Sequence, residues 1–126
     1  MDEPIFVFGS NLAGIHGAGA ARYALLHHGA AMGQGVGIQG TSCAIPTKDY
    51  QIQTLPLERI EWYIKSFCTV AKWTPGTVYH VTQIGCGLAG LEPKDIAPMF
   101  RGAPANCKFS TAWKPWLPMH QTWTDE

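Results

Sequence analysis

The sequence predicts a single α/β domain, a compact three-layer α/β/α sandwich with a mostly parallel central sheet. Strand-like and helix-like segments alternate along the chain, and parallel strands need such crossover helices. The first strand-like segment, PIFVF at 4–8, contains no polar residue, which is typical of a strand buried on both faces. The length of 126 residues suffices for one domain, and we expect it to span residues 1–126.

The first half of the chain is expected to supply two strands and two helices. After the strand at 4–8, the alanine-rich segment 17–28 predicts a helix. A glycine-rich stretch then leads to a short strand at 42–45, which Pro46 should end because proline cannot donate to a sheet. The segment 57–72 predicts the clearest helix, since its apolar residues recur at helical spacing.

The second half adds two strands, a short helix and a tail. The segments VYHVTQIG at 78–85 and NCKFST at 106–111 predict strands. Between them, EPKDIAPMF at 92–100 predicts a short helix with a proline in its first turn. The tail at 112–126 is rich in tryptophan and proline. We expect it to be irregular and to serve as a hydrophobic cover, a contact between copies in an oligomer, or an aromatic platform for a base.

Composition disfavours several classes of function. The formal net charge is zero, whereas general binding to nucleic acid or to an anionic membrane needs a basic surplus. The sequence has no apolar stretch of the length that spans a bilayer, and its start, MDEPIF, is acidic where a secretory signal is basic. We therefore expect a cytoplasmic protein that does not bind membranes.

Cysteine and histidine usage argues against a metal centre. The cysteines, Cys43, Cys68, Cys86 and Cys107, are widely spaced and form no CxxC pair. Two of the five histidines are adjacent, which directs their side chains to different sides of a helix. The expectation is reduced, buried thiols, with no metal and no cofactor.

Two glycine-rich loops follow predicted strands, at 9–19 and at 85–90. In parallel sheets, ligands bind where the carboxyl ends of strands pass into such loops. Glycine lets the backbone approach a ligand and present its N–H groups, so two facing loops would suit a diphosphate, although they could also serve only as turns and helix starts. The segment GIHGAG at 14–19 lacks the GxGxxG spacing and no GxxxxGK[ST] occurs, which disfavours standard nicotinamide and nucleoside triphosphate sites.

Four segments resemble macrodomains, and most closely the branch that includes the terminal ADP-ribose protein glycohydrolase. They are HGAGAARYALLHHGA, SCAIPTKD, LPLERIEWYIKSF and VTQIGCGLAGLEPKDIAPMF, in the same order as in that branch. The resemblance covers roughly residues 5–100. It implies a macrodomain-like fold that binds ADP-ribose or a related nucleotide, with ADP-ribosylated protein or nucleic acid as the larger partner.

The resemblance also implies a set of ligand-binding residues. Asn11 would bind the distal ribose, and the start of the helix near 17 would face the diphosphate, where a helix N-terminus favours anions. The loop containing IGCGL would form the second phosphate site. The implied residues are Asn11, Gly14, His16, Gly17, Ala18, Gly19, Gly85, Cys86, Gly87, Leu88 and Ala89.

This chain departs from the family pattern in two ways. The strands that would precede 4–8 and carry an adenine-recognising Asp are missing, so the sheet is expected to be smaller and truncated at its N-terminal side. The family's Lys that attacks the anomeric carbon corresponds to Lys48, after Thr47, but its assisting Asp is replaced by Ala89. We therefore expect a binding protein. The alternatives are a hydrolase with Lys48 as nucleophile and an oligomer-forming scaffold with a vestigial site.

Several side chains have more than one interpretation. Lys48 could be a desolvated nucleophile, a point charge for the diphosphate, or a solvated lysine. In the first loop, His16 could contact a phosphate, transfer a proton, or be a surface residue. Cys86, at a helix start, is expected to be a packing residue rather than a nucleophile.

Two carboxylates and two tyrosines also have more than one interpretation. Asp49 could substitute for the missing acid, but adjacent residues of a strand point to opposite faces. Glu92, three positions past Ala89, could reach the site, but it is expected to cap the following helix. Tyr23 and Tyr50 could stack on a base, but packing is the expected role.

Overall fold

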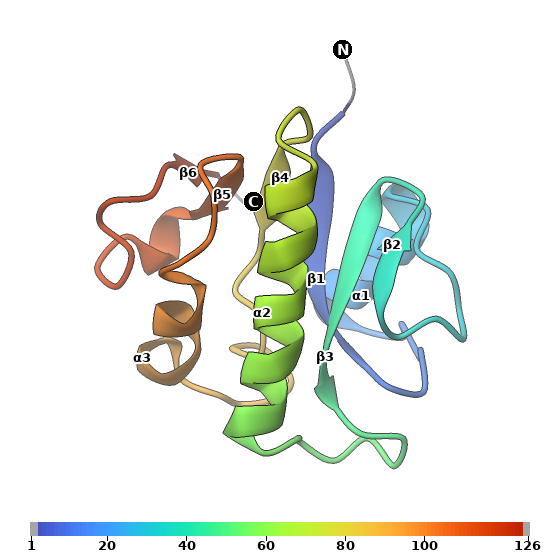
Figure 1. The fold of residues 1–126 in the computed structure, drawn as a ribbon. Helices are drawn as coiled ribbons and strands as arrows, with labels where there is room; N and C mark the ends of the chain where they lie inside the picture. The colour runs from blue at the N-terminus through green and yellow to red at the C-terminus, as the bar shows by residue number, and fades with distance from the viewer. Residues whose placement is uncertain (1–2, 125–126) are drawn as a thin grey trace.

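The computed structural model describes residues 3–124, which form a six-stranded sheet with helices on both faces (Figure 1). The strand order is β2-β3-β1-β4-β5-β6, and every neighbouring pair is parallel except β2 with β3. The α/β class with a mostly parallel sheet is therefore confirmed. The strands are β1 (Ile5–Asn11), β2 (Gly37–Gln39), β3 (Ser42–Lys48), β4 (Tyr79–Val81), β5 (Cys107–Ser110) and β6 (Thr122–Trp123).

The helices lie on opposite sides of the sheet: α2 crosses in front of it in Figure 1, and α1 lies behind. Their bounds are α1 (Gly19–His27), α2 (Leu57–Trp73) and α3 (Pro93–Ile96), with 3₁₀ turns η1 (Ala97–Phe100) and η2 (Thr111–Trp113). The predicted helix at 92–100 is thus divided into α3 and η1. The division falls next to Pro98, which cannot donate an α-helical hydrogen bond. No helix in residues 3–124 is long and apolar enough to cross a membrane.

Alternating residues of β1 separate two hydrophobic clusters. Val7 belongs to the larger cluster, where Ile60, Ile64 and Phe67 of α2 are buried. Phe6 and Phe8 belong to the smaller cluster beneath α1, together with alanines of that helix. Small side chains let α1 lie close to β1, while the long apolar stripe of α2 covers the opposite face.

Two predicted strand ends were wrong. The strand β3 continues through Pro46 to Lys48, because β2 pairs only as far as Ala44 and proline is tolerated where a strand has no partner on one side. Conversely, β4 ends at Val81 rather than 85. There, the Thr82 N–H and hydroxyl both donate to the Val7 carbonyl, at 3.0 and 2.7 Å, and the chain turns away from the sheet.

The expected irregular tail at 112–126 is wrong in part, because η2 and β6 are regular elements, and residues 125–126 lie outside the described residues. The tail also contributes to the core. The side chains of Trp113 and Leu117 are fully buried in the larger cluster. The strand β6 pairs in parallel with β5. The indole N–H of Trp123, on the edge strand β6, donates to the Val81 carbonyl of β4 at 3.0 Å and ties the tail to the face of the sheet.

We predict that Trp113→Ala lowers the free energy of unfolding by about 3–5 kcal/mol, because it leaves a large cavity in a close-packed core. Chemical denaturation followed by circular dichroism measures this change. Trp73→Ala is the matched control, since Trp73 is 80% exposed and its loss should change the free energy by less than about 0.5 kcal/mol. Equal stability of the two variants would show that the tail does not belong to the cooperative fold.

Candidate functional site

A cleft of about 1190 Å³ lies along β1, on the face of the sheet that α1 partly covers. It is somewhat larger than the roughly 300–1,000 Å³ of typical small-molecule sites, so it has room for a dinucleotide-sized ligand. Both glycine-rich loops contribute to its wall. The predicted ligand-binding residues that line it are Asn11, Gly17, Ala18, Gly19, Gly85, Cys86, Gly87, Leu88 and Ala89.

The two loops approach one another across the end of β1. A Cβ atom placed on Gly9 would lie 3.3 Å from the Gly85 nitrogen, and one on Gly19 would lie 3.6 Å from Leu88 Cδ1. This proximity follows from the pairing of β1 with β4, which brings their carboxyl ends to one edge of the sheet. The predicted juxtaposition of the two loops is therefore present.

The start of α1 presents unpaired backbone donors to the cleft. The N-cap residue, Ala18, has no side chain to cap the helix, and the first turn contains no acidic residue. The first helical hydrogen bond runs from Arg22 N–H to the Ala18 carbonyl, at 3.2 Å, which leaves the N–H groups of Gly19, Ala20 and Ala21 without helical acceptors. All three residues line the cleft. Such a helix start attracts anions.

The facing loop adds further donors. Among the described residues, no backbone carbonyl accepts from the N–H groups of Gly87 and Leu88. A Cβ on Gly87 would meet no atom within 4 Å, so the cleft is open there. The loop itself is held in shape by hydrogen bonds from Leu91 N–H to Gly85 O and from Gly90 N–H to Gly87 O, at 2.9 and 3.0 Å.

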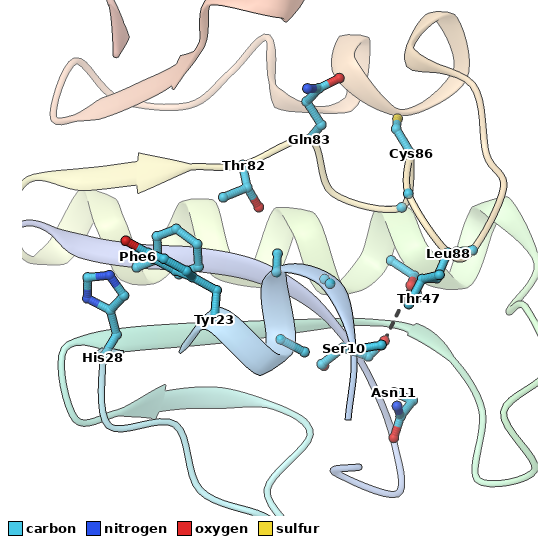
Figure 2. A pocket seen from close by; sticks show the side chains of 18 of the residues that line it. Phe6, Ser10, Asn11, Tyr23, His28, Thr47, Thr82, Gln83, Cys86 and Leu88 are labelled. Atoms are coloured by element: carbon cyan, nitrogen blue, oxygen red, sulfur yellow. Dashed lines mark hydrogen bonds between the residues drawn. The ribbon is translucent and has the colours of Figure 1, made fainter. Parts of the chain in front are cut away.

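One end of the cleft is polar and contains Asn11, Thr47 and Lys48 (Figure 2 labels the first two). The amide of Asn11 accepts from Ile15 N–H at 3.0 Å and donates to Ile15 O at 2.9 Å. It therefore closes the first loop, and its oxygen and nitrogen each retain capacity for one more hydrogen bond. Lys48 is opposite Asn11 in the β1–β3 register and is half-buried.

No described carboxylate forms an ion pair with Lys48. The described acidic residue that lines the cleft is Glu3, which precedes β1. Lys48 is level with Asn11 at the other end of that strand, and the length of β1 from Ile5 to Asn11, roughly 20 Å at about 3.3 Å per residue, separates the backbones of Glu3 and Lys48. The catalytic acid that the resemblance would require beside Lys48 is thus not found among these residues.

Two of the predicted ligand-binding residues do not line the cleft. His16 is fully buried, with Nε2 3.0 Å from the Gln34 carbonyl and its ring against Phe8, so the expectation of a surface or phosphate-binding histidine is wrong. Gly14 packs against backbone, since a Cβ there would lie 2.3 Å from the Gly33 carbonyl carbon. Both residues hold the first loop in place.

Asp49 and Glu92, the two carboxylates that could have assisted Lys48, do not line the cleft. The Asp49 carboxylate accepts from the N–H groups of Gln51 and Gln53, at 2.9 and 3.0 Å, and so closes a turn. Glu92 is the N-cap residue of α3, as expected, but its exposed side chain makes no capping hydrogen bond.

The other end of the cleft is aromatic. The tail and Tyr23 were among the residues that could stack on a base, but their grouping with Phe6 and two histidines was not predicted. Figure 2 shows Phe6, Tyr23 and His28 grouped there, away from Asn11 and Thr47. His80 and Trp123 line the same cleft, so the tail reaches the site. The only sequence signal was an aromatic residue in each of several separate segments. Tyr50, by contrast, is exposed and does not line the cleft.

No family of proteins, no curated protein and no solved structure was found to match this chain. The resemblance to macrodomains therefore stays a prediction. Among the residues 3–124, no group of three or more His, Cys, Asp or Glu side chains is arranged to hold a metal ion.

We predict that the four cysteines react slowly with iodoacetamide in the folded protein. Burial raises the pKa of Cys43 and Cys107 to about 12 and that of Cys68 to about 11, and it also raises the pKa of Cys86. A raised pKa lowers the thiolate fraction at pH 8, so alkylation followed by mass spectrometry should be at least about tenfold slower than in the unfolded chain. Rapid, selective modification of Cys86 would instead identify an activated thiol.

Proposed function

We propose that the protein binds ADP-ribose, or a nucleotide or adduct that contains ADP-ribose, in this cleft. The observation that carries the proposal is the convergence of backbone donors from the start of α1 and from Gly87 and Leu88 on one open space. Two sets of N–H groups on opposite walls suit a ligand with two linked phosphates. They also provide a binding site for an anion without a basic surface, in keeping with the zero net charge.

In this proposal the diphosphate lies level with Gly9 and Gly85, and the distal ribose lies toward Asn11. The remaining oxygen and nitrogen capacity of the Asn11 amide suits a sugar hydroxyl, which both donates and accepts. Lys48, on the neighbouring strand, adds a positive charge near the phosphates.

The alternative of a hydrolase is favoured by one observation, the position of Lys48 in the cleft wall. In that case its amine would attack the anomeric carbon of the distal ribose. Such a step needs a group to assist the leaving oxygen, and Ala89 occupies the position where the resemblance implies an Asp. We therefore prefer binding. The scaffold alternative is weakened because Trp113 is used in the core and Trp123 in the cleft.

Replacing Gly87 by Val is predicted to abolish binding of ADP-ribose while the protein stays folded. The branched side chain would enter the open space between the loops, where a Cβ meets no protein atom. Isothermal titration calorimetry should give a measurable heat with the wild type and none with Gly87→Val. The melting temperature should change by only a few degrees.

Gly102→Val is the matched control for this experiment. A Cβ at Gly102 also meets open space, but the residue lies outside the cleft, so affinity should stay at the wild-type value. Undiminished affinity in a folded Gly87→Val protein would exclude the loop at 85–88 as the phosphate site. Absence of any heat with the wild-type protein would contradict the proposed function itself.

For Lys48 we expect a loss of affinity rather than of turnover. Lys48→Ala should weaken binding several-fold, and the difference should shrink at high salt because screening weakens the charge interaction. Neither protein should release ADP-ribose from modified carboxylates faster than buffer does, as followed by chromatography of the released sugar nucleotide. Release by the wild type that Lys48→Ala abolishes would establish the hydrolase instead.

A further inference from the structure

We propose that the purine base of the nucleotide binds at the aromatic end of the cleft, stacked on the paired rings of His80 and Trp123. This inference rests on the proposed function, because it assumes that the diphosphate lies between the glycine loops. It assigns the base to residues of β4 and β6. The adenine-recognising Asp that the resemblance would imply is not needed for it.

The spacing of residues along β1 can be compared with the distance between the diphosphate and the base of the ligand. Gly9 faces the second loop, and Phe6 is three residues earlier, which corresponds to about 10 Å along the strand. Phe6 is opposite His80 in the β1–β4 register. One ribose and its 5′ carbon bridge a similar span between a diphosphate and a base, so the aromatic end lies where the base of the ligand must be.

Opposite ends of the ligand thus correspond to opposite ends of the cleft. Asn11 is two residues beyond Gly9 in the other direction, on the side assigned to the distal ribose. The same continuous cleft contains Asn11, Gly85, His80 and Trp123. A nucleotide diphosphate sugar in this orientation would lie parallel to β1 and leave neither end of the cleft empty.

The rings at this end are held in place for stacking. The His80 and Trp123 rings are parallel, with centroids 4.6 Å apart and planes 17° apart. The indole of Trp123 cannot rotate freely, because its N–H is bonded to the Val81 carbonyl at 3.0 Å. Trp123 also meets Phe6 edge-to-face at 6.2 Å. A preordered platform costs less entropy when a base stacks on it than flexible side chains would.

Two histidines give this end polar groups suited to a base. The ring of His28 stacks on Phe6 with centroids 4.7 Å apart, and His28 and His80 both line the cleft. Burial lowers the pKa of both imidazoles, so they are mainly neutral at pH 7. A neutral imidazole offers one donor and one acceptor. In His28, Nδ1 lies 3.4 Å from the Thr41 hydroxyl, which leaves Nε2 for a ring nitrogen or exocyclic group of a purine.

The test compares ADP-ribose with ribose 5-diphosphate, a probe that has the phosphates but no base. Calorimetry with the wild type should show ADP-ribose binding at least about tenfold more tightly. Trp123→Ala should remove most of that advantage while leaving the affinity for ribose 5-diphosphate unchanged. Trp123→Leu, which keeps much of the apolar volume, should behave in the same way. Trp73→Ala, on the exposed surface of α2, is the control and should bind both ligands as the wild type does.

A measurement on the wild-type protein covers the case in which the Trp123 variants do not fold. In proton NMR spectra, the imidazole resonances of His80 and His28 should shift when ADP-ribose is added, because a stacked base imposes a ring current on them. Ribose 5-diphosphate should shift them much less. His80→Gln provides the assignment of the His80 signals.

The outcomes separate the two proposals. Binding of ADP-ribose that is equally tight in folded Trp123→Ala, or that leaves both imidazole signals unmoved, would overturn the base site and leave the proposed function standing. Equal affinity of the wild type for ADP-ribose and ribose 5-diphosphate would also overturn the base site and leave the proposed function standing. If neither ligand binds the wild type, the proposed function fails and the base site fails with it.

Discussion

The site depends on close contact between two stretches of backbone on the side of the first loop that faces away from the cleft. A Cβ on Gly35 would lie 2.0 Å from the Asn11 carbonyl oxygen, and one on Gly14 would lie 2.3 Å from the Gly33 carbonyl carbon. The Ser10 hydroxyl donates to the Gly35 carbonyl across the same contact. None of the three glycines lines the cleft. This packing fixes the end of β1, and with it the direction from which α1 begins and presents its free N–H groups.

The loop glycines have two opposite structural roles. At Gly14 and Gly35 a side chain is excluded because backbone already fills the space, whereas at Gly87 a side chain is absent and the space stays open. Both uses give the same sequence signal, a glycine in a loop after a strand. The signal sufficed to predict that two loops meet at one edge of the sheet. It could not separate the residues that support a loop from those that leave room for a ligand, and Gly14 was misassigned for that reason.

The errors in the predicted fold arise where the structure depends on contacts between residues far apart in the chain. The helix α2 was predicted to within one residue because its apolar stripe is a local pattern. The ends of β3 and β4 depend on partners far away in the chain; for example, Thr82 donates to the carbonyl of Val7. No local sequence pattern predicts such strand ends. His16 was expected at the surface because loop residues usually are exposed. It is buried because the segment around Gln34 folds over it, a contact eighteen residues away.

The aromatic end of the cleft and the packing of the tail against the sheet have the same cause, which is that α1 covers only part of one face of the sheet. The smaller hydrophobic cluster contains residues of β1, β3 and α1, but from β4–β6 it receives only the partly buried Trp123. A helix of nine residues cannot cover the whole face of a six-stranded sheet, so part of that face depends on side chains for its cover. The stacking of Trp123 on His80 supplies some cover and leaves a channel beside α1. His80 and Trp123 therefore have two roles. They shield part of this face of the sheet from solvent, and they form the aromatic end of the cleft.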